Sequence, residues 1–290
     1  YDPDGQLDID IIPPKPLQLL TTRWGARDAN WFFDFPTSAK KVTDLLEASK
    51  IYREQNIRFD GVVAINVAVL KTMLEVAGPV ELPEYRLTVT PENFLAAIQR
   101  EVESGADNRA GEPKRILKKL APVLIERLGQ LTEESRRALL AGLKTHTENK
   151  DIMLFFKDAE LESYLTDLNV SGAVKKLPLN FSGDYLAVVS ANIGGGKSDA
   201  YVAQKIKLSS KLDGQGRIDN YLTIERTHAG ADAKDPWYRA TNRTYVKVFT
   251  PSDSRLTFLT GHEQKKISPP IDYRAAGYLA DAEVRRVEET

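Results

Sequence analysis

The hydrophobic pattern changes near residue 198, and this change constrains the fold more than any other feature of the chain. Before it, short apolar runs alternate with segments whose apolar residues recur at helical spacing, as in α/β folds. After it, single apolar and polar residues alternate between turn-forming segments, which predicts antiparallel strands. We therefore expect an α/β domain over residues 1–198, with a mixed sheet covered by helices. A smaller antiparallel β domain, sandwich-like and truncated, is expected over residues 199–290.

Individual elements follow from the same periods. A helix capped by Thr37 or Ser38 is expected to run to residue 55. Further helices are predicted at residues 67–76, 92–103, 113–128, 132–145 and 159–168. Short β-branched or apolar runs between turn formers predict strands at residues 58–66, 80–89, 152–156 and 184–191, the first of them buried.

Composition excludes several classes of function. Lys and Arg number 40 against 41 Asp and Glu, so no overall field draws nucleic acid or an anionic membrane to the chain. The absence of Cys removes thiol catalysis, disulfides and thiolate metal sites. No run approaches the ~20 apolar residues of a membrane-spanning helix, so we expect membrane contact only through a segment that this sequence lacks.

Residues 191–198, Ala-Asn-Ile-Gly-Gly-Gly-Lys-Ser, resemble a phosphate-binding loop. Such a loop needs a helix directly after the Lys-Ser pair, because backbone donors at the helix N-terminus hold the phosphates. The residues that follow alternate as a strand instead. We expect a tight turn between the domains in which glycines take positive φ; its structural residues are Asn192, Gly194, Gly195, Gly196 and Lys197. A nucleotide-binding enzyme is the alternative.

Charged and aromatic residues crowd one segment near the N-terminus. Arg23, Arg27, Asp28 and Asp34 lie there among three phenylalanines and two tryptophans. Guanidinium groups suit phosphate, and carboxylates can hold Mg²⁺ against it. These four residues are therefore candidates for binding phosphate or metal. The alternative is a buried network in which the rings form core and the charges pair with each other.

No catalytic residue can be named from the sequence. His146, His228 and His262 share no metal-ligand spacing, and no Ser, His and acid residue forms a recognisable catalytic pattern. No cofactor is evident. The sequence leaves open whether the protein is an enzyme.

Five motifs in order resemble the bacterial family called domain of unknown function 4012. They occupy residues 27–31, 34–39, 60–65, 78–80 and 192–199. The resemblance implies an exported protein at the extracellular face of the cell envelope. It also implies a membrane anchor in the full-length protein, through an N-terminal helix that this sequence lacks.

More distantly, residues 60–79 and the Arg-Asp turn before them are similar to the LytR-CpsA-Psr family. Members of that family transfer glycopolymers from polyprenyl pyrophosphate to the cell wall. The similarity implies a LytR-CpsA-Psr-like sheet and places Arg27 and Asp28 at the family's Arg-Asp motif, with Mg²⁺ at the pyrophosphate. Residues 92–130 lack the family's later Arg-rich motif.

Two functions follow. The favoured one is a non-catalytic binding or scaffolding module whose β domain contacts an envelope glycan or a protein partner. An exposed apolar or aromatic patch over residues 201–258 would favour it. The alternative is binding or transfer of a polyprenyl-linked glycan by the four Arg and Asp residues, which requires a cavity beside them.

Overall fold

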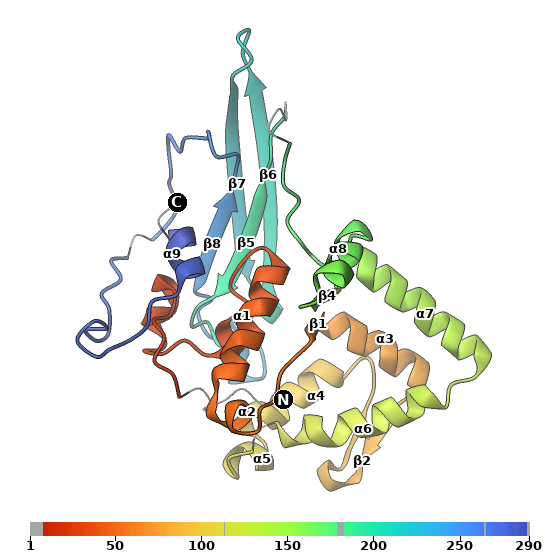
Figure 1. The fold of residues 1–290 in the computed structure, drawn as a ribbon. Coiled ribbons are helices and arrows are strands. Elements are labelled where there is room, and N and C mark those ends of the chain that lie inside the picture. The colour runs from red at the N-terminus through yellow and green to blue at the C-terminus, as the bar shows by residue number, and fades with distance from the viewer. Residues whose placement is uncertain (1–7, 113, 179–182, 264, 289–290) are drawn as a thin grey trace. The chain divides into compact units, whose positions relative to one another are not determined.

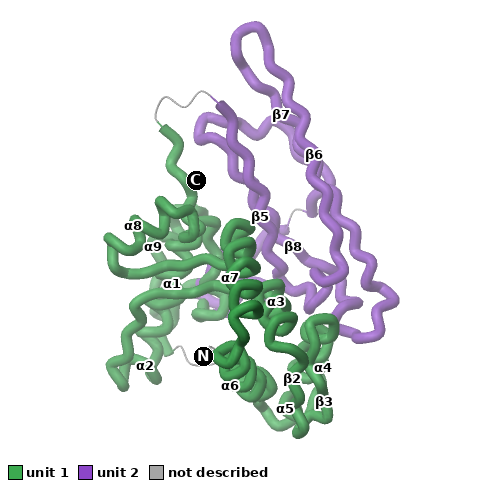
Figure 2. The backbone as a smooth tube through the Cα atoms, turned by 90° about the vertical axis from the view of Figure 1, so that its right-hand side faces the viewer, with its two compact units in different colours: residues 1–12, 23–181, 273–290 green, residues 13–22, 182–272 purple. Residues whose placement is uncertain are grey.

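A computed structural model describes residues 8–112, 114–178, 183–263 and 265–288. The chain divides into two compact units, drawn in separate colours in Figure 2. The first combines residues 1–12, 23–181 and 273–290, and the second combines residues 13–22 and 182–272. Compactness alone does not define a domain, so the predicted boundary after residue 198 stays a prediction.

The first unit contains most of the helices (Figure 1). They are α1 (Phe35–Ala48), α2 (Lys50–Glu54), α3 (Val67–Ala77), α4 (Phe94–Ser104), α5 (Ala106–Arg109), α6 (Arg115–Gly129), α7 (Glu133–Glu148), α8 (Ala159–Asp167) and α9 (Ala282–Glu288). Its strands are β1 (Gly61–Ile65), β2 (Val80–Leu82), β3 (Leu87–Val89) and β4 (Ile152–Phe156). The five helices predicted from residue 67 onward are confirmed, with small shifts at their ends.

The first helix differs from its prediction at both ends. Asp34, rather than Thr37 or Ser38, is the N-cap of α1, and its Oδ2 accepts a hydrogen bond of 3.0 Å from the Thr37 backbone N–H. Pro36 then occupies the first turn, where its missing N–H costs nothing. Ser49 is extended, with φ −68° and ψ 147°, so the helical segment is broken into α1 and α2.

The described residues form four two-stranded antiparallel sheets, β1–β4, β2–β3, β5–β8 and β6–β7. This corrects the prediction of one mixed sheet. It also corrects the prediction that residues 58–66 form a buried strand, because Val63 of β1 is 61% exposed. Val62 and Ala64 pack against Phe35 and Ala39 of α1, so helix covers one face of this two-stranded sheet.

The main core of the first unit lies between helices and the β2–β3 hairpin. Leu74, Val80, Val89 and Ile116 are completely buried in it, together with five further buried side chains: Leu82, Phe94, Ile98, Leu120 and Leu124. These residues belong to α3, α4, α6, β2 and β3. Apolar residues at helical spacing on α3, α4 and α6 therefore pack against the short β2–β3 hairpin.

The second unit is built from β5 (Ala187–Asn192), β6 (Val202–Leu212), β7 (Ile218–His228) and β8 (Thr244–Phe249). The predicted antiparallel strands are confirmed. β6 and β7 form the long hairpin of Figure 1, closed by a hydrogen bond of 3.0 Å from the Asp213 N–H to the Arg217 carbonyl. Among the residues that the structure describes, no helix is long and apolar enough to cross a membrane.

Candidate binding site

Arg23, Arg27 and Asp28 form ion pairs at the surface of the first unit. Arg23 Nη2 lies 2.6 Å from Asp10 Oδ1, and Arg27 Nε lies 3.3 Å from Asp28 Oδ2. These charged side chains are all partly exposed, so they do not form a buried network, whereas both tryptophans and one phenylalanine of the same segment are buried, as that alternative expected. Their binding of phosphate stays a prediction.

The carboxylate of Asp34 accepts hydrogen bonds that stabilise the local fold. Besides capping α1, its Oδ2 accepts a hydrogen bond of 2.6 Å from the Thr37 hydroxyl, and its Oδ1 accepts one of 2.9 Å from the Val174 N–H. No group of three or more His, Asp or Glu within the described ranges could hold a metal ion. Asp34 therefore has a structural role that the sequence analysis did not assign.

Glu162 of α8 is a partly buried carboxyl influenced by Asp34. Its Oε2 accepts a hydrogen bond of 2.9 Å from the Phe156 N–H, whereas its Oε1 is buried without a hydrogen-bond partner among the described residues. Burial, and to a smaller extent the charge of Asp34, raise the pKa of Glu162. The folded protein therefore favours the protonated form.

Glu162→Gln is expected to stabilise the protein at pH 7, because it removes a charge that burial disfavours and keeps a carbonyl oxygen to accept from the Phe156 N–H. Because the folded pKa lies above the unfolded value, the wild type loses stability as the pH rises from 4.5 through the folded pKa. Thermal unfolding between pH 4 and 7 measures this slope. Glu160→Gln, at an exposed position of the same first turn, is the control. Equal slopes for Glu162→Gln and wild type would contradict the prediction.

A polar relay joins α3, α7 and the start of β4. His146 Nε2 lies 3.0 Å from the Thr72 hydroxyl, and His146 Nδ1 lies 2.8 Å from Asp151 Oδ2. The hydrogen bond to His146 lowers the pKa of Asp151. The order hydroxyl, imidazole, carboxylate is that of a catalytic triad. However, a Cβ added at Gly142 would lie only 2.8 Å from Thr72 Cγ2, so Thr72 faces a close helix contact, and we interpret the relay as structural.

The loop at residues 192–199 is a tight turn, as predicted. Gly194 and Gly196 have φ of 110° and 57°, and Asn192 Oδ1 accepts a hydrogen bond of 2.7 Å from the Gly195 N–H. After Lys197 comes a short 3₁₀ turn (Ser198–Tyr201) and then β6. The helix that nucleotide binding requires does not follow. The loop lies inside the second compact unit, and its expected place between two domains stays a prediction.

Gly196→Ala is expected to destabilise the second unit by about 2 kcal/mol, since positive φ costs a non-glycine residue roughly 1–3 kcal/mol and the added Cβ would lie 2.9 Å from the Trp237 carbonyl oxygen. Gly216→Ala is the matched control, because Gly216 also has positive φ but nothing lies within 4 Å of an added Cβ. Urea denaturation compares the two variants. Equal losses would show that the contact with Trp237 is unimportant.

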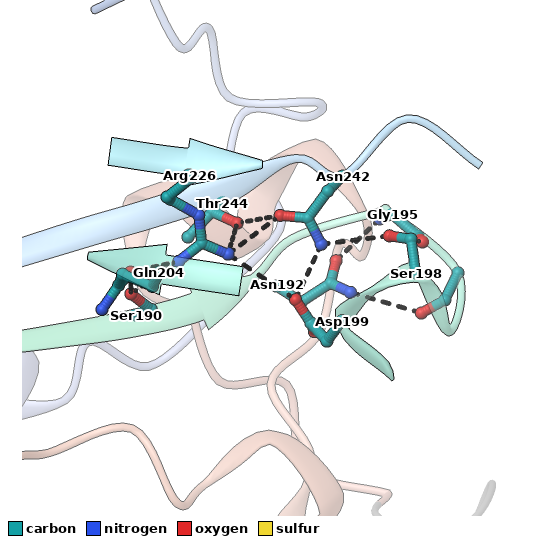
Figure 3. A network of polar contacts seen from close by, with 10 residues as sticks. Ser190, Asn192, Gly195, Ser198, Asp199, Gln204, Arg226, Asn242 and Thr244 are labelled. Atoms are coloured by element: carbon teal, nitrogen blue, oxygen red, sulfur yellow. Dashed lines mark hydrogen bonds and ion pairs between the residues drawn. The ribbon is translucent and has the colours of Figure 1, made fainter. Parts of the chain in front are cut away.

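Arg226 of β7 is the centre of a polar network beside this loop (Figure 3). Its Nη1 donates to Ser190 Oγ at 3.1 Å and to Gln204 Oε1 at 2.6 Å. Its Nη2 donates to Asn242 Oδ1 at 3.1 Å and to Thr244 Oγ1 at 3.0 Å. Ser190, Gln204 and Thr244 belong to β5, β6 and β8, and Asn242 lies just before β8. One guanidinium therefore joins both sheets of the second unit.

Asn242 extends the network to the loop. Its Nδ2 donates to Asp199 Oδ1 at 2.7 Å and to Ser198 Oγ at 3.0 Å, and Ser198 Oγ donates to the Gly195 carbonyl at 2.6 Å. Ser198 is fully buried. The loop is thereby fixed relative to Arg226, as the dashed lines of Figure 3 show.

These contacts surround a hollow of about 230 Å³ in the second unit. It is lined by Ser190, Asn192, Asp199, Val202, Gln204 and Arg226. The lining combines hydroxyl, amide, carboxylate and guanidinium groups in fixed positions, which suits recognition of a polar ligand. We take this hollow as the candidate binding site.

Sequence reasoning identified the loop but missed Arg226, Gln204 and Asp199. A signal was present in the alternation of the two long strands. Gln204 and Arg226 face each other in register, at positions that share a face with the apolar pairs Ile206↔Ile224 and Leu208↔Leu222. Polar residues at apolar positions of a strand indicate a buried network or a site.

The described residues thus define a two-unit protein of helices and antiparallel ribbons with a polar hollow in the second unit. Residues 12–102 match the family model described as Protein of unknown function (DUF4012). This match supports the DUF4012 family at the four motifs between residues 27 and 80, whereas the motif at residues 192–199 lies outside the matched residues. No curated protein and no solved structure matches the chain.

Proposed function

We propose that the protein is a non-catalytic binding module of the bacterial cell envelope, and that it holds a glycan in the hollow beside Arg226. The network that fixes the lining of the hollow is the observation that carries this proposal. Side chains held in place before a ligand arrives lose little entropy when it binds. The four acceptors around Arg226 provide that order.

The size of the hollow favours a small part of a glycan. About 230 Å³ is below the ~300–1,000 Å³ of pockets that bury a drug-sized ligand. One sugar ring or the end of a chain suits such a space. The larger glycan would then extend over the surface of the second unit.

A protein contact is the second part of the proposed scaffolding role. Exposed apolar side chains follow the β6–β7 hairpin toward its tip, with Leu208, Leu212 and Ile218 at 47%, 67% and 42% exposure. Tyr221, Leu256 and Phe258 are also exposed within residues 201–258. Such apolar surface favours interaction with a partner.

The envelope setting rests on the family resemblance. We propose an extracellular position, with a membrane anchor in the full-length protein, and a LytR-CpsA-Psr-like ancestry for the fold of the first unit. Transfer of a polyprenyl-linked glycan with Mg²⁺ gains less support, because Asp34 caps α1 and Arg23 pairs with Asp10.

Saturation-transfer NMR with methyl β-D-glucoside, methyl β-D-galactoside and methyl α-D-mannoside tests the proposal. At least one of these sugars is expected to show transfer from the wild type. Gln204→Met, which removes one amide of the lining, should abolish the signal, whereas Gln215→Met in the exposed hairpin turn should retain it. No transfer from any sugar, or full transfer to Gln204→Met, would overturn the proposal.

A further inference from the structure

We infer that the hollow selects uncharged sugar rings over acidic ones, and that Asp199 is the residue that excludes anions. The inference rests on the proposed function, since it names the class of glycan that the same hollow would take. It follows from how the two charged groups of the lining are bonded. Arg226 and Asp199 differ in both their exposure and their remaining hydrogen-bonding capacity.

The N–H donors on both terminal nitrogens of Arg226 are directed at the protein itself. A guanidinium has five N–H donors, and the four on Nη1 and Nη2 donate to Ser190, Gln204, Asn242 and Thr244. The side chain is only 22% exposed. A ligand carboxylate could not form the paired contact with both terminal nitrogens that makes arginine a strong anion receptor.

The negative charge of Asp199 is presented to solvent. Its side chain is 52% exposed, and its Oδ1 lies 3.8 Å from Arg226 Nη2. Oδ1 also accepts the hydrogen bond from Asn242. Oδ2 has no hydrogen-bond partner among the described residues, so this oxygen is available to a ligand donor. A ligand carboxylate or phosphate at the same place would meet like charge.

The remaining hydrogen-bonding groups of the hollow suit the hydroxyl groups of a ligand. Two donors have no partner within the described part of the chain, the Gln204 amide nitrogen and the Arg226 Nε–H, and the Asp199 Oδ2 is an acceptor. A hydroxyl both donates and accepts. Neighbouring hydroxyls of one ring can therefore donate to Asp199 and accept from Gln204 or Arg226, whereas a carboxylate can only accept.

The experiment compares neutral sugars with their uronic acids. Methyl β-D-glucoside and methyl β-D-galactoside are titrated against methyl β-D-glucuronide and methyl β-D-galacturonide, which carry a carboxylate in place of the C6 hydroxymethyl group. Amide chemical shifts give each Kd for the wild type, Asp199→Asn and Asp219→Asn. Asp219 is the control, because it is exposed on β7, pairs with Lys211 in the register and does not line the hollow.

The wild type is expected to bind a neutral sugar more tightly than its uronic acid by up to about fivefold, the factor that repulsion between unit charges about 4 Å apart gives at the dielectric constant of water, reduced by the attraction of Arg226, which lies 3.8 Å from Asp199. Asp199→Asn keeps an acceptor for Asn242 and should reduce this preference to about twofold or less. Asp219→Asn should leave it unchanged.

The outcomes separate the inference from the proposed function. Equal or tighter binding of the uronic acids to the wild type would overturn the inference while supporting glycan binding. An unchanged preference in Asp199→Asn would overturn the role of Asp199. Absence of binding by all four sugars would overturn the proposed function itself.

Discussion

Arg226→Lys is expected to destabilise the second unit by about 2–4 kcal/mol, because a hydrogen bond to a charged group contributes about 1.5–3 kcal/mol and an ammonium, with three donors on one atom, cannot replace the four hydrogen bonds of the planar guanidinium. Asn242 and Gln204 would also lose the contacts that hold them beside the hollow. Sugar binding should therefore be lost together with stability. Amide hydrogen exchange of β5 to β8, measured across urea concentrations, reports the stability of this unit.

Arg217→Lys provides the matched comparison. Arg217 lies next to the hairpin turn with a side chain that is 74% exposed, and its ion pairs with Asp213 and Asp219 are at the surface. Such pairs contribute about 0–1 kcal/mol. If Arg226→Lys were no more destabilising than Arg217→Lys, the network of Figure 3 would not hold the two sheets together.

Leu74→Ala is expected to cost about 2–5 kcal/mol in the first unit, the range for removing a buried leucine from a packed core. Leu74 is completely buried in the cluster formed by α3, α4, α6 and the β2–β3 hairpin. Thermal and urea unfolding measure the loss. Leu140→Ala on α7 serves as control, because Leu140 is 60% exposed and its truncation should cost less than about 1 kcal/mol. Similar losses in both variants would contradict this assignment of the core.

The helices of the first unit could be predicted because each carries a complete local signal. Residues 67–77, for example, combine helical spacing of apolar side chains with Asn66 before them and Gly78 after them. The cap of α1 was less accessible. Asp34, Thr37 and Ser38 are all good caps, and the choice of Asp34 depends partly on the distant Val174 N–H.

Strand pairing could not be predicted in the same way. β1 and β4 pair over residues far apart in the sequence, and no local pattern identifies the partner of a strand. A short apolar run in the sequence is equally compatible with a strand of a buried sheet and with a strand of a two-stranded sheet that is covered on one face. The mixed sheet was expected for that reason.

The candidate site shows the same division between local and distant signals. The glycines of residues 194–196 indicate a turn on their own, and positive φ at Gly194 and Gly196 confirms it. The four partners of Arg226 come from three strands and the segment before β8. Only the folded chain brings these partners together. The sequence predicted a site in the first unit instead, because the candidate residues there, Arg23, Arg27, Asp28 and Asp34, lie close together in the sequence itself.

The most direct test of sugar binding beside Arg226 is an amide chemical-shift map of the wild-type protein titrated with methyl β-D-glucoside and methyl β-D-galactoside. We expect the shifts to concentrate at residues 190–204, 226 and 242–244, which contain the hollow and its network. Shifts confined to residues 23–34, with the hollow unaffected, would contradict this expectation and support a ligand site at the N-terminal Arg and Asp residues instead.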